Sequence, residues 1–256
     1  MKCLCVLIST WATAEKSNIC VYADRPWLKA DDIIREPDEP LAGDLAREVR
    51  HQGKWRWRSR EHCLTCAARM NEGLLRGWNE RVRPGDTVLH IGDFCCKGNE
   101  RGMGGDKSKA QYWLEQLHGT KVMILGNHDR NNSLPRGLLY GAIEAGNLKI
   151  GLIHNPHDLL PGDYDVVACG HVHRAWAWRF IGGRLYVNVG VDVRNYRPMR
   201  LVEFVETAKK ILRENPDRRD SGLQDHHEEE DGPLPIVVAD ASSAGGGAGG
   251  LVGPVG

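Results

Sequence analysis

The sequence predicts a layered α/β domain, and two kinds of pattern support this prediction. Short apolar runs of strand length recur along the chain, and each ends at a glycine or a polar residue. Between two of these runs, residues 107–118 have apolar side chains at helical spacing from Tyr112 to Leu117, and Gly119 follows as a helix end. A strand, a helix and a strand in succession form the βαβ unit typical of layered α/β folds.

Length and composition narrow the class of protein. A chain of 256 residues allows one domain with an appended tail. Its 34 basic and 34 acidic side chains cancel, so no overall charge attracts the protein to nucleic acid or to a membrane. No apolar run approaches the roughly 18 residues of a membrane helix. The eight cysteines are scattered and several fall in predicted strands, which indicates reduced thiols and favours a cytoplasmic location.

The N-terminal part is predicted to contain one strand and one insertion. The strand spans Leu4 to Ile8, in a run too short and too weakly charged for a secretory signal. Residues 36–62 are predicted as an insertion, because Pro37 and Pro40 break a helix. Within it, Lys54–Arg60 alternates cations with aromatic residues, a composition that can follow phosphates and stack on bases. The simpler interpretation is a solvated segment with two tryptophans packed on the domain.

The middle of the chain is predicted to form a packing helix and then strands. The helix spans Cys66 to Val82, and the next strand covers Asp86–Ile91. His90 lies inside that apolar run, and we interpret it as a core histidine and not as a ligand. After Asp129 we expect a loop and a short helix, and then a strand over Leu148–Ile153.

The C-terminal part is predicted to complete the domain and end in a tail. The expected strands are Asp165–Cys169, Trp176–Phe180, Arg184–Val191 and 199–205, and a helix follows to about residue 213. The domain is therefore predicted to span residues 1–213. Residues 214–256 are polar and then rich in glycine and alanine, so they offer too little apolar surface to order and are predicted to be a flexible tail.

Polar side chains follow four predicted strands at the point where each strand ends, including Val122–Leu125, which runs into Gly126. If these strands lie side by side in one sheet, the side chains converge. The set is Asp93, Asn127, His154, His171 and His173, with His128 and Asp129 next to Asn127. Oxygen and nitrogen donors without a thiolate suit Mn, Fe or Zn in a reactive site better than a structural zinc.

The order of four short motifs resembles that of the metallophosphoesterase, or calcineurin-like phosphoesterase, superfamily. The motifs are Gly92-Asp93, Gly126–Asp129, His154 and Gly170–His173. Asn188–Val193 and Tyr196–Pro198 resemble the small bacterial and phage branch of this superfamily, and the resemblance covers roughly residues 1–206. It implies a single-domain αββα fold, a β-sandwich flanked by helices.

The resemblance also implies metal-dependent hydrolysis of phosphoesters. Asp93 would bridge two divalent ions; Asn127, His154 and His171 would hold one of them, and His173 would help to hold the other. Manganese is the expected metal, with Fe, Zn, Ni or Co as alternatives. Two such ions can activate a water and neutralise charge on phosphate oxygens. His128, oriented by Asp129, would be the general acid for the leaving group.

The first metal motif departs from the family pattern. Members of the family end their first strand in Asp-x-His, and this chain has no such motif near its first strand. One register places Trp11 and Thr13 at the two ligand positions, and another places Glu15 and Ser17 there. Glu15 could coordinate a metal ion and Trp11 could not. In both registers the histidine is lost, so we expect an impaired first metal site.

Several functions are compatible with this site. The resemblance to the small bacterial and phage branch implies activity on cyclic nucleotides and similar small phosphodiesters. A phosphodiesterase that acts on such substrates is therefore the first hypothesis. A phosphomonoesterase or a nuclease is the alternative among enzymes, and Lys54–Arg60 would then serve nucleic acid. A non-catalytic module that binds a nucleotide or RNA through a degenerate site is the alternative from another class. The sequence indicates no membrane partner and leaves the substrate-binding residues and the oligomeric state unassigned.

Overall fold

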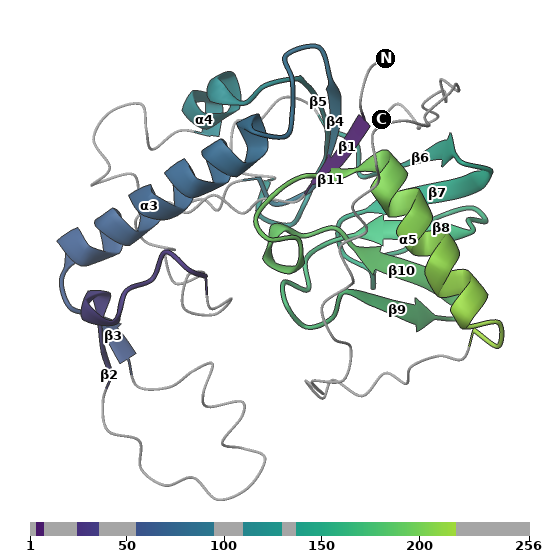
Figure 1. Ribbon diagram of the computed structural model, residues 1–256. Coiled ribbons are helices and arrows are strands. Elements are labelled where there is room, and N and C mark those ends of the chain that lie inside the picture. The colour runs from purple at the N-terminus through teal and green to yellow at the C-terminus, as the bar shows by residue number, and fades with distance from the viewer. Residues whose placement is uncertain (1–3, 8–24, 36–54, 95–109, 130–136, 219–256) are drawn as a thin grey trace, which may run out of the picture.

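Two β-sheets lie at the centre of the fold in the computed structural model (Figure 1), which describes residues 4–7, 25–35, 55–94, 110–129 and 137–218. The first sheet contains, in spatial order, β11 (Met199–Arg200), β1 (Leu4–Leu7), β4 (Thr87–Ile91) and β5 (Thr120–Ile124). The second contains β6 (Tyr140–Ala145), β7 (Leu148–Ile153), β8 (Val166–Cys169), β10 (Arg184–Asn188) and β9 (Trp178–Ile181). The expected layered α/β sandwich is confirmed.

Parallel pairing brings together the carboxyl ends of the strands that precede the candidate site residues. In the first sheet β1, β4 and β5 are parallel, and β11 pairs antiparallel to β1. In the second sheet β7, β8 and β10 are parallel, while β6 and β9 are antiparallel neighbours at its two edges. The carboxyl ends of β4 and β5 therefore meet at one edge of the first sheet, and those of β7 and β8 meet at one edge of the second.

The main core lies between the two sheets. Leu89 and Ile91 of β4 share one cluster with Leu152 of β7, Val187 of β10 and Phe204 of the C-terminal helix. The alternate residues of β4 point the other way, because successive side chains of a strand face opposite sides. As a result β4 is buried on both faces and has a nearly continuous apolar sequence.

Helices α3 (Arg60–Asn79) and α4 (Ala110–Gln116) flank the first sheet (Figure 1). Their apolar side chains pack with Val88 of β4 in a second cluster, to which α3 contributes Met70, Leu74 and Trp78, and α4 contributes Trp113 and Leu114. Helix α3 begins six residues before the predicted Cys66, because Ser59 caps it by accepting a hydrogen bond from the His62 amide at 3.3 Å.

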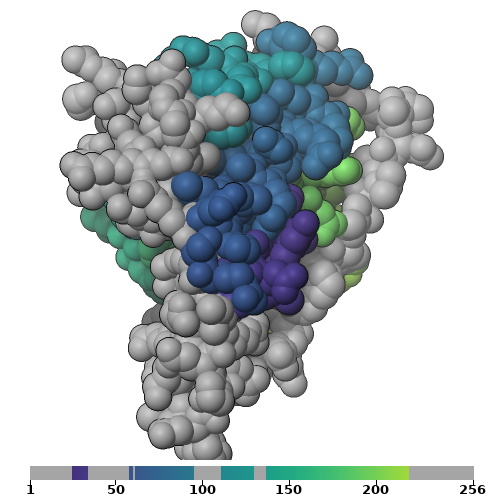
Figure 2. Space-filling view, turned by 90° about the vertical axis from the view of Figure 1, so that its left-hand side faces the viewer, coloured from purple at the N-terminus to yellow at the C-terminus, as the bar shows by residue number. Residues whose placement is uncertain are grey.

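The segment before α3 packs along that helix. Figure 2 shows the atoms of residues 25–33, in purple, against the blue atoms of α3. The Arg69 Nε of α3 donates to the Trp27 carbonyl at 3.1 Å, and its guanidinium also pairs with Asp32 of the 3-10 turn η1 (Ala30–Asp32). Strand β2 (Ile33–Arg35) then pairs antiparallel with β3 (Trp55–Trp57).

Two elements differ from the sequence prediction. Strand β6 was not expected; it forms because Gly146 and Asn147, at φ +57° and +63°, make a tight turn that pairs it with β7. The last predicted strand, 199–205, is wrong beyond Arg200, where α5 (Leu201–Glu214) begins. The Glu203 carboxylate accepts a hydrogen bond from the Arg200 amide at 3.1 Å and so closes the first turn of that helix.

Several predictions fall on residues outside the described ranges. These include the first metal motif near Glu15 and most of the predicted insertion and tail. Of the insertion, residues 55–62 are described and form β3 and the beginning of α3. No helix in the described ranges combines the length and apolar character that crossing a membrane requires.

Candidate metal centre

The predicted ligands lie where strand ends of both sheets meet. Asp93 and Asn127 follow β4 and β5 of the first sheet, while His154 and His171 follow β7 and β8 of the second. The side chains converge as expected, although the expectation considered strands side by side in one sheet and the structure divides them between two sheets. The site instead lies across the two sheets, so both must be in place before the ligands can come together.

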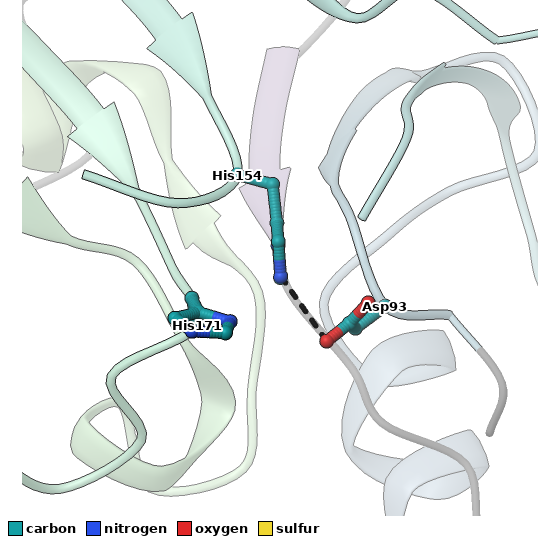
Figure 3. A group of neighbouring side chains, drawn as sticks. All are labelled: Asp93, His154 and His171. Carbon is teal, nitrogen blue, oxygen red and sulfur yellow. Dashed lines mark ion pairs between the residues drawn. The ribbon is translucent and has the colours of Figure 1, made fainter. Parts of the chain in front are cut away.

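His154 is oriented by a backbone carbonyl. Its Nδ1 lies 3.0 Å from the Ile91 oxygen, and because a carbonyl can only accept, Nδ1 carries the proton of this bond. The other ring nitrogen, Nε2, points to the Asp93 carboxylate at 3.1 Å (Figure 3) and to the Asn127 Oδ1 at 3.1 Å. Burial would lower the pKa of His154, but the hydrogen bond and negative charge of Asp93 raise it.

Asp93 is held in place through one oxygen and presents the other. Its Oδ1 accepts a hydrogen bond from the His128 amide at 2.8 Å, while Oδ2 faces His154. Burial would raise the pKa of Asp93, but the hydrogen bond and charge of His154, together with the His128 amide, lower it. The carboxylate is therefore ionised at neutral pH and available as a ligand.

His171 completes a group of three side chains that could hold a metal ion. One ligand atom from each of Asp93, His154 and His171 lies within 4.8 Å of the others. The rings of His154 and His171 are 5.2 Å apart and nearly perpendicular, at 79°. In Figure 3 the three side chains converge from separate strand ends on a common centre.

The backbone of this centre is strained. Asp93, His171 and His173 have φ of +52°, +69° and +47°, a region that non-glycine residues rarely adopt. Such conformations cost about 1–3 kcal/mol each and persist where the surrounding structure imposes them. The folded chain therefore stabilises an arrangement that local conformational preference alone would not produce.

His173 is held by a buried ion pair. Its Nδ1 lies 2.9 Å from Asp192 Oδ2, and the Arg25 guanidinium binds both oxygens of Asp192, at 2.7 and 3.0 Å. Burial would raise the pKa of Asp192, but Arg25 and His173 hold it well below its usual range. The Nε2 of His173 is thereby left for another partner. Asp93, His154 and His173 also line one small cavity with Arg25.

Asn188 fixes the loop that carries His173. Its side-chain amide donates to the carbonyls of His173 and Trp176, both at 2.8 Å, and its Oδ1 accepts from the Gly190 amide at 2.8 Å. Arg194 donates to the Asn188 carbonyl in turn. The end of β10 thus positions the loop after β8.

Asp129 connects the two loops of the first sheet. Its carboxylate accepts hydrogen bonds from the Phe94 amide at 2.8 Å and the Gly126 amide at 2.9 Å. It therefore holds the segment after β4 against the turn after β5. Its orienting effect on His128, and the general-acid role of His128, stay predictions.

The chemistry of the donor set fits a divalent cation. The His154 Nε2 lies 3.1 Å from both the Asp93 Oδ2 and the Asn127 Oδ1, and all three atoms can offer a lone pair to a metal ion once Nε2 has lost its proton. Converging acceptors are stabilised by a cation between them. The donors suit Mn, Fe or Zn, and the Nδ1–H of His154 bonded to Ile91 is the outer contact that ligating histidines commonly have.

Asp192 and Arg25 were missed as contributors to the site. Asp192 lies in the stretch Asn188–Val193, which carries part of the family resemblance, but the sequence assigns no role to Asp192 or to Arg25. They are 167 positions apart, so nothing in their local context predicts that they pair. The apolar residues near the site were also missed, because single exposed leucines carry no sequence signal.

Comparison with known proteins identifies the family. A model of the calcineurin-like phosphoesterase superfamily domain matches residues 70–200, which are 131 of the 256 residues. The chain belongs to this superfamily, whose members bind divalent metal ions. An uncharacterized protein of Methanocaldococcus jannaschii is 34% identical over 149 residues, which make up 56% of this chain and 78% of that protein.

Solved structures show weaker likeness. A protein of unknown function from Aquifex aeolicus has a TM-score of 0.47 and 16% identity, covering 80% of this chain and 99% of that one. Vps29 of Entamoeba histolytica in complex with zinc has a TM-score of 0.30 and 17% identity, covering 73% of each chain. The fold described above rests on this chain's own strand pairing and on the family match.

Proposed function

We propose that this protein is a metal-dependent phosphodiesterase that hydrolyses cyclic nucleotides or similar small phosphodiesters. The observation that carries the proposal is the convergence of Asp93, Asn127 and His154, whose Nε2 lies 3.1 Å from an oxygen of each of the other two and whose ring is oriented by Ile91. A phosphoester substrate fits the family and the donor set. Hydrolysis of a diester in addition requires a proton for a poor leaving group, and His128 beside the centre supplies a candidate donor.

The side chains have separate tasks in this proposal. Asp93, Asn127, His154 and His171 would hold a divalent ion, which would lower the pKa of an attacking water, so that its proton passes to solvent, and would neutralise charge on the phosphate. The resulting hydroxide oxygen would bond to phosphorus while the bond from phosphorus to the leaving oxygen breaks. His128 donates its proton to that leaving oxygen, and Asp129 keeps the surrounding loops in place.

Among the described residues, Asp93 as a bridge and His173 are the ligands proposed for a second ion. The remaining ligands of that ion are expected from the segment around Glu15, which lies outside the described residues. Manganese stays the expected metal, with Fe, Zn, Ni or Co as alternatives, and a cytoplasmic location stays a prediction. A contact between Lys54–Arg60 and nucleic acid is likewise a proposal.

The test measures metal binding and hydrolysis on the same protein. Metal-free protein is titrated with Mn²⁺ while bound metal and the cleavage of a generic aryl phosphodiester are followed. Parallel reactions use a cyclic nucleotide, an aryl phosphomonoester and single-stranded DNA. We expect metal-dependent cleavage of the diester and the cyclic nucleotide, since His128 can protonate their leaving oxygens.

A matched pair of variants makes the result specific to the centre. His154→Gln removes a central ligand, and His62→Gln changes a histidine bonded to Ser59 at the beginning of α3. Only the first is expected to abolish metal uptake and cleavage. Faster cleavage of the monoester or of DNA would replace the proposed substrate class. Metal binding without any cleavage, even at saturating Mn²⁺, would favour a non-catalytic nucleotide-binding module.

A further inference from the structure

A cavity of ≈ 430 Å³ opens beside the metal centre. Asn127, His154 and His171 form the side of the cavity that belongs to the centre. Its other sides come mainly from two separate segments, Leu139 and Tyr140 at the beginning of β6 and the loop that follows β7. A substrate whose phosphate is held by the centre would therefore extend its remaining part into this cavity.

The walls away from the centre are largely apolar. Leu139 and Leu159, 63% and 87% exposed, line the cavity from different segments, and Tyr140 lies next to Leu139. Among the described residues one other large apolar side chain is exposed, Val202 of α5 at 44%. A single exposed leucine is ordinary, but two from separate segments facing one cavity form an apolar patch next to a reactive site. Such lining is typical of sites for small molecules.

The charge of the residues that line the cavity further restricts the class of ligand it could bind. Among the described residues that line the cavity, none is a lysine or an arginine, and Asp158 contributes a carboxylate. The Asn155 side chain donates to this carboxylate at 3.2 Å and holds it at the loop. A nucleic acid strand or a polyphosphate needs cations along its phosphates. The lining therefore suits an organic group that carries no charge of its own and offers hydrogen-bond donors to Asp158.

We propose that this cavity binds the nucleoside-like part of the substrate, an uncharged group with a flat apolar face, and that Leu139 and Leu159 select for it. Its volume lies within the about 300–1,000 Å³ of small-molecule sites. The proposal rests on the proposed function, because it assumes that the phosphate lies at Asp93, His154 and His171. It deepens that function by naming which side chains determine the organic part of the substrate.

The first test compares binding of adenosine 5′-monophosphate and inorganic phosphate to the Mn²⁺-loaded protein. Leu139→Ser and Leu159→Ser are each expected to weaken binding of the nucleotide by roughly three- to tenfold, because the apolar contact with the base is lost. Binding of inorganic phosphate should not change. Both leucines are exposed, so their replacement leaves the fold intact, and Val202→Ser is the matched control that should change neither affinity.

A second experiment tests the role of the Asp158 carboxylate in the cavity. Asp158→Leu is expected to weaken binding of adenosine 5′-monophosphate and to leave binding of inorganic phosphate unchanged, because a carboxylate that accepts hydrogen bonds from the uncharged part of the ligand is removed. Equal binding of the nucleotide by variant and wild type would contradict this role of Asp158. In hydrolysis of a cyclic nucleotide, the Leu139 and Leu159 variants should raise KM and leave kcat unchanged, since they do not contact the reacting atoms.

The outcomes separate this proposal from the proposed function. If wild-type protein binds phosphate and cleaves a simple aryl diester, while the leucine variants bind the nucleotide as tightly as the wild type, the cavity proposal is overturned and the proposed function stands. If the Mn²⁺-loaded protein neither binds phosphate nor cleaves any diester, the proposed function fails first. Equal loss of nucleotide and phosphate binding in the leucine variants would also contradict a selective role for the cavity.

Discussion

Among single residues, His154 shows how one backbone atom determines the chemistry of a side chain. The Ile91 carbonyl accepts the Nδ1 proton of His154, so Nε2 is the atom that faces Asp93 and Asn127. Without this bond either ring nitrogen could carry the proton. The end of β4 therefore determines which nitrogen of a residue on the second sheet is presented to a metal ion.

Replacement of His128 should slow cleavage of the substrate without changing the amount of bound metal. His128→Ala should slow cleavage of a diester with a poor leaving group by about 100- to 10,000-fold, because a general acid contributes a factor of this size. Its bond to Asp93 uses the backbone amide, which alanine retains, so bound metal should not change. Cleavage of an aryl diester with a nitrophenolate leaving group should slow much less. If His128→Ala cleaved the diester with the poor leaving group as fast as the wild type does, the general-acid role would be contradicted.

His90, fully buried in β4 as expected of a core histidine, should make folding sensitive to acid. Burial and, to a smaller extent, the charge of His154 lower its pKa from 6.5 to about 3. Between these two pH values the unfolded chain binds a proton that the folded chain does not. The free energy of unfolding should therefore fall as the pH falls, by up to about 1.4 kcal/mol per pH unit.

Denaturant titrations between pH 7 and pH 4 test this sign. His90→Leu should reduce the slope of stability against pH, because the group that titrates only in the unfolded chain is gone. His157→Leu, at an exposed position, is the control and should leave the slope as in the wild type. An unchanged slope in His90→Leu would show that other groups cause the acid sensitivity.

Of the elements, the turn after β5 is the one on which the site depends most closely. Gly126 is buried, and a Cβ at this position would collide with the Asp93 carboxylate and its amide. The Gly126 amide also donates to Asp129, so the turn, Asp93 and Asp129 form one packed unit. This is why the polar residues after β5 follow a glycine and not a larger residue.

Gly126→Ala should therefore damage both stability and metal binding. Overpacking of a well-packed position costs about 1–3 kcal/mol, and a displaced Asp93 should lower metal affinity by about tenfold or more. Gly85→Ala is the matched control, because a Cβ there meets open space. Chemical denaturation and calorimetric titration with Mn²⁺ would measure the two effects. Normal metal affinity in Gly126→Ala would show that Asp93 tolerates the shift.

For the whole molecule, the buried pair of Arg25 and Asp192 joins distant parts of the chain. Arg25 precedes η1, and Asp192 lies in the 3-10 turn η4 (Val191–Val193) after β10. Because the pKa of Asp192 is depressed, the pair stabilises the fold above the pKa of an unfolded aspartate, about 4, and this contribution is lost as the pH falls further. Asp192 of this pair also bonds to His173, which lines a small cavity with Asp93 and His154.

Arg25→Met should cost about 3–5 kcal/mol at neutral pH, because it leaves a buried carboxylate without its cation. The double variant Arg25→Met with Asp192→Leu should be less destabilised than the single one, since no unpaired charge remains. Arg184→Met, which removes an exposed pair with Asp163, is the matched control and should cost less than about 1 kcal/mol. Urea denaturation of the three variants is the measurement. A double variant no more stable than Arg25→Met would contradict an electrostatic origin of the effect.

The sequence by itself determined the class of fold and the family, and it predicted the side chains that converge at the candidate metal centre. Apolar runs that end in glycine and polar residues are local patterns, and the strands after which Asp93, Asn127, His154 and His171 follow appear where they were predicted. Local patterns also determined that His90 belongs to the core. Local patterns did not predict β6, whose own sequence gives no clear strand signal and which pairs with β7 through the turn at Gly146 and Asn147. They also did not predict that α5 begins at Leu201.

Only the tertiary structure decided how these parts meet. The division of the ligands between two sheets, the Nδ1 proton of His154 held by Ile91, and the pairing of Arg25 with Asp192 all join residues far apart in the chain. The same holds for the cavity that Leu139 and Leu159 line together with residues of the candidate metal centre. Such contacts depend on the packing of one sheet against the other, and a periodicity of two or of 3.6 residues carries no information about that packing.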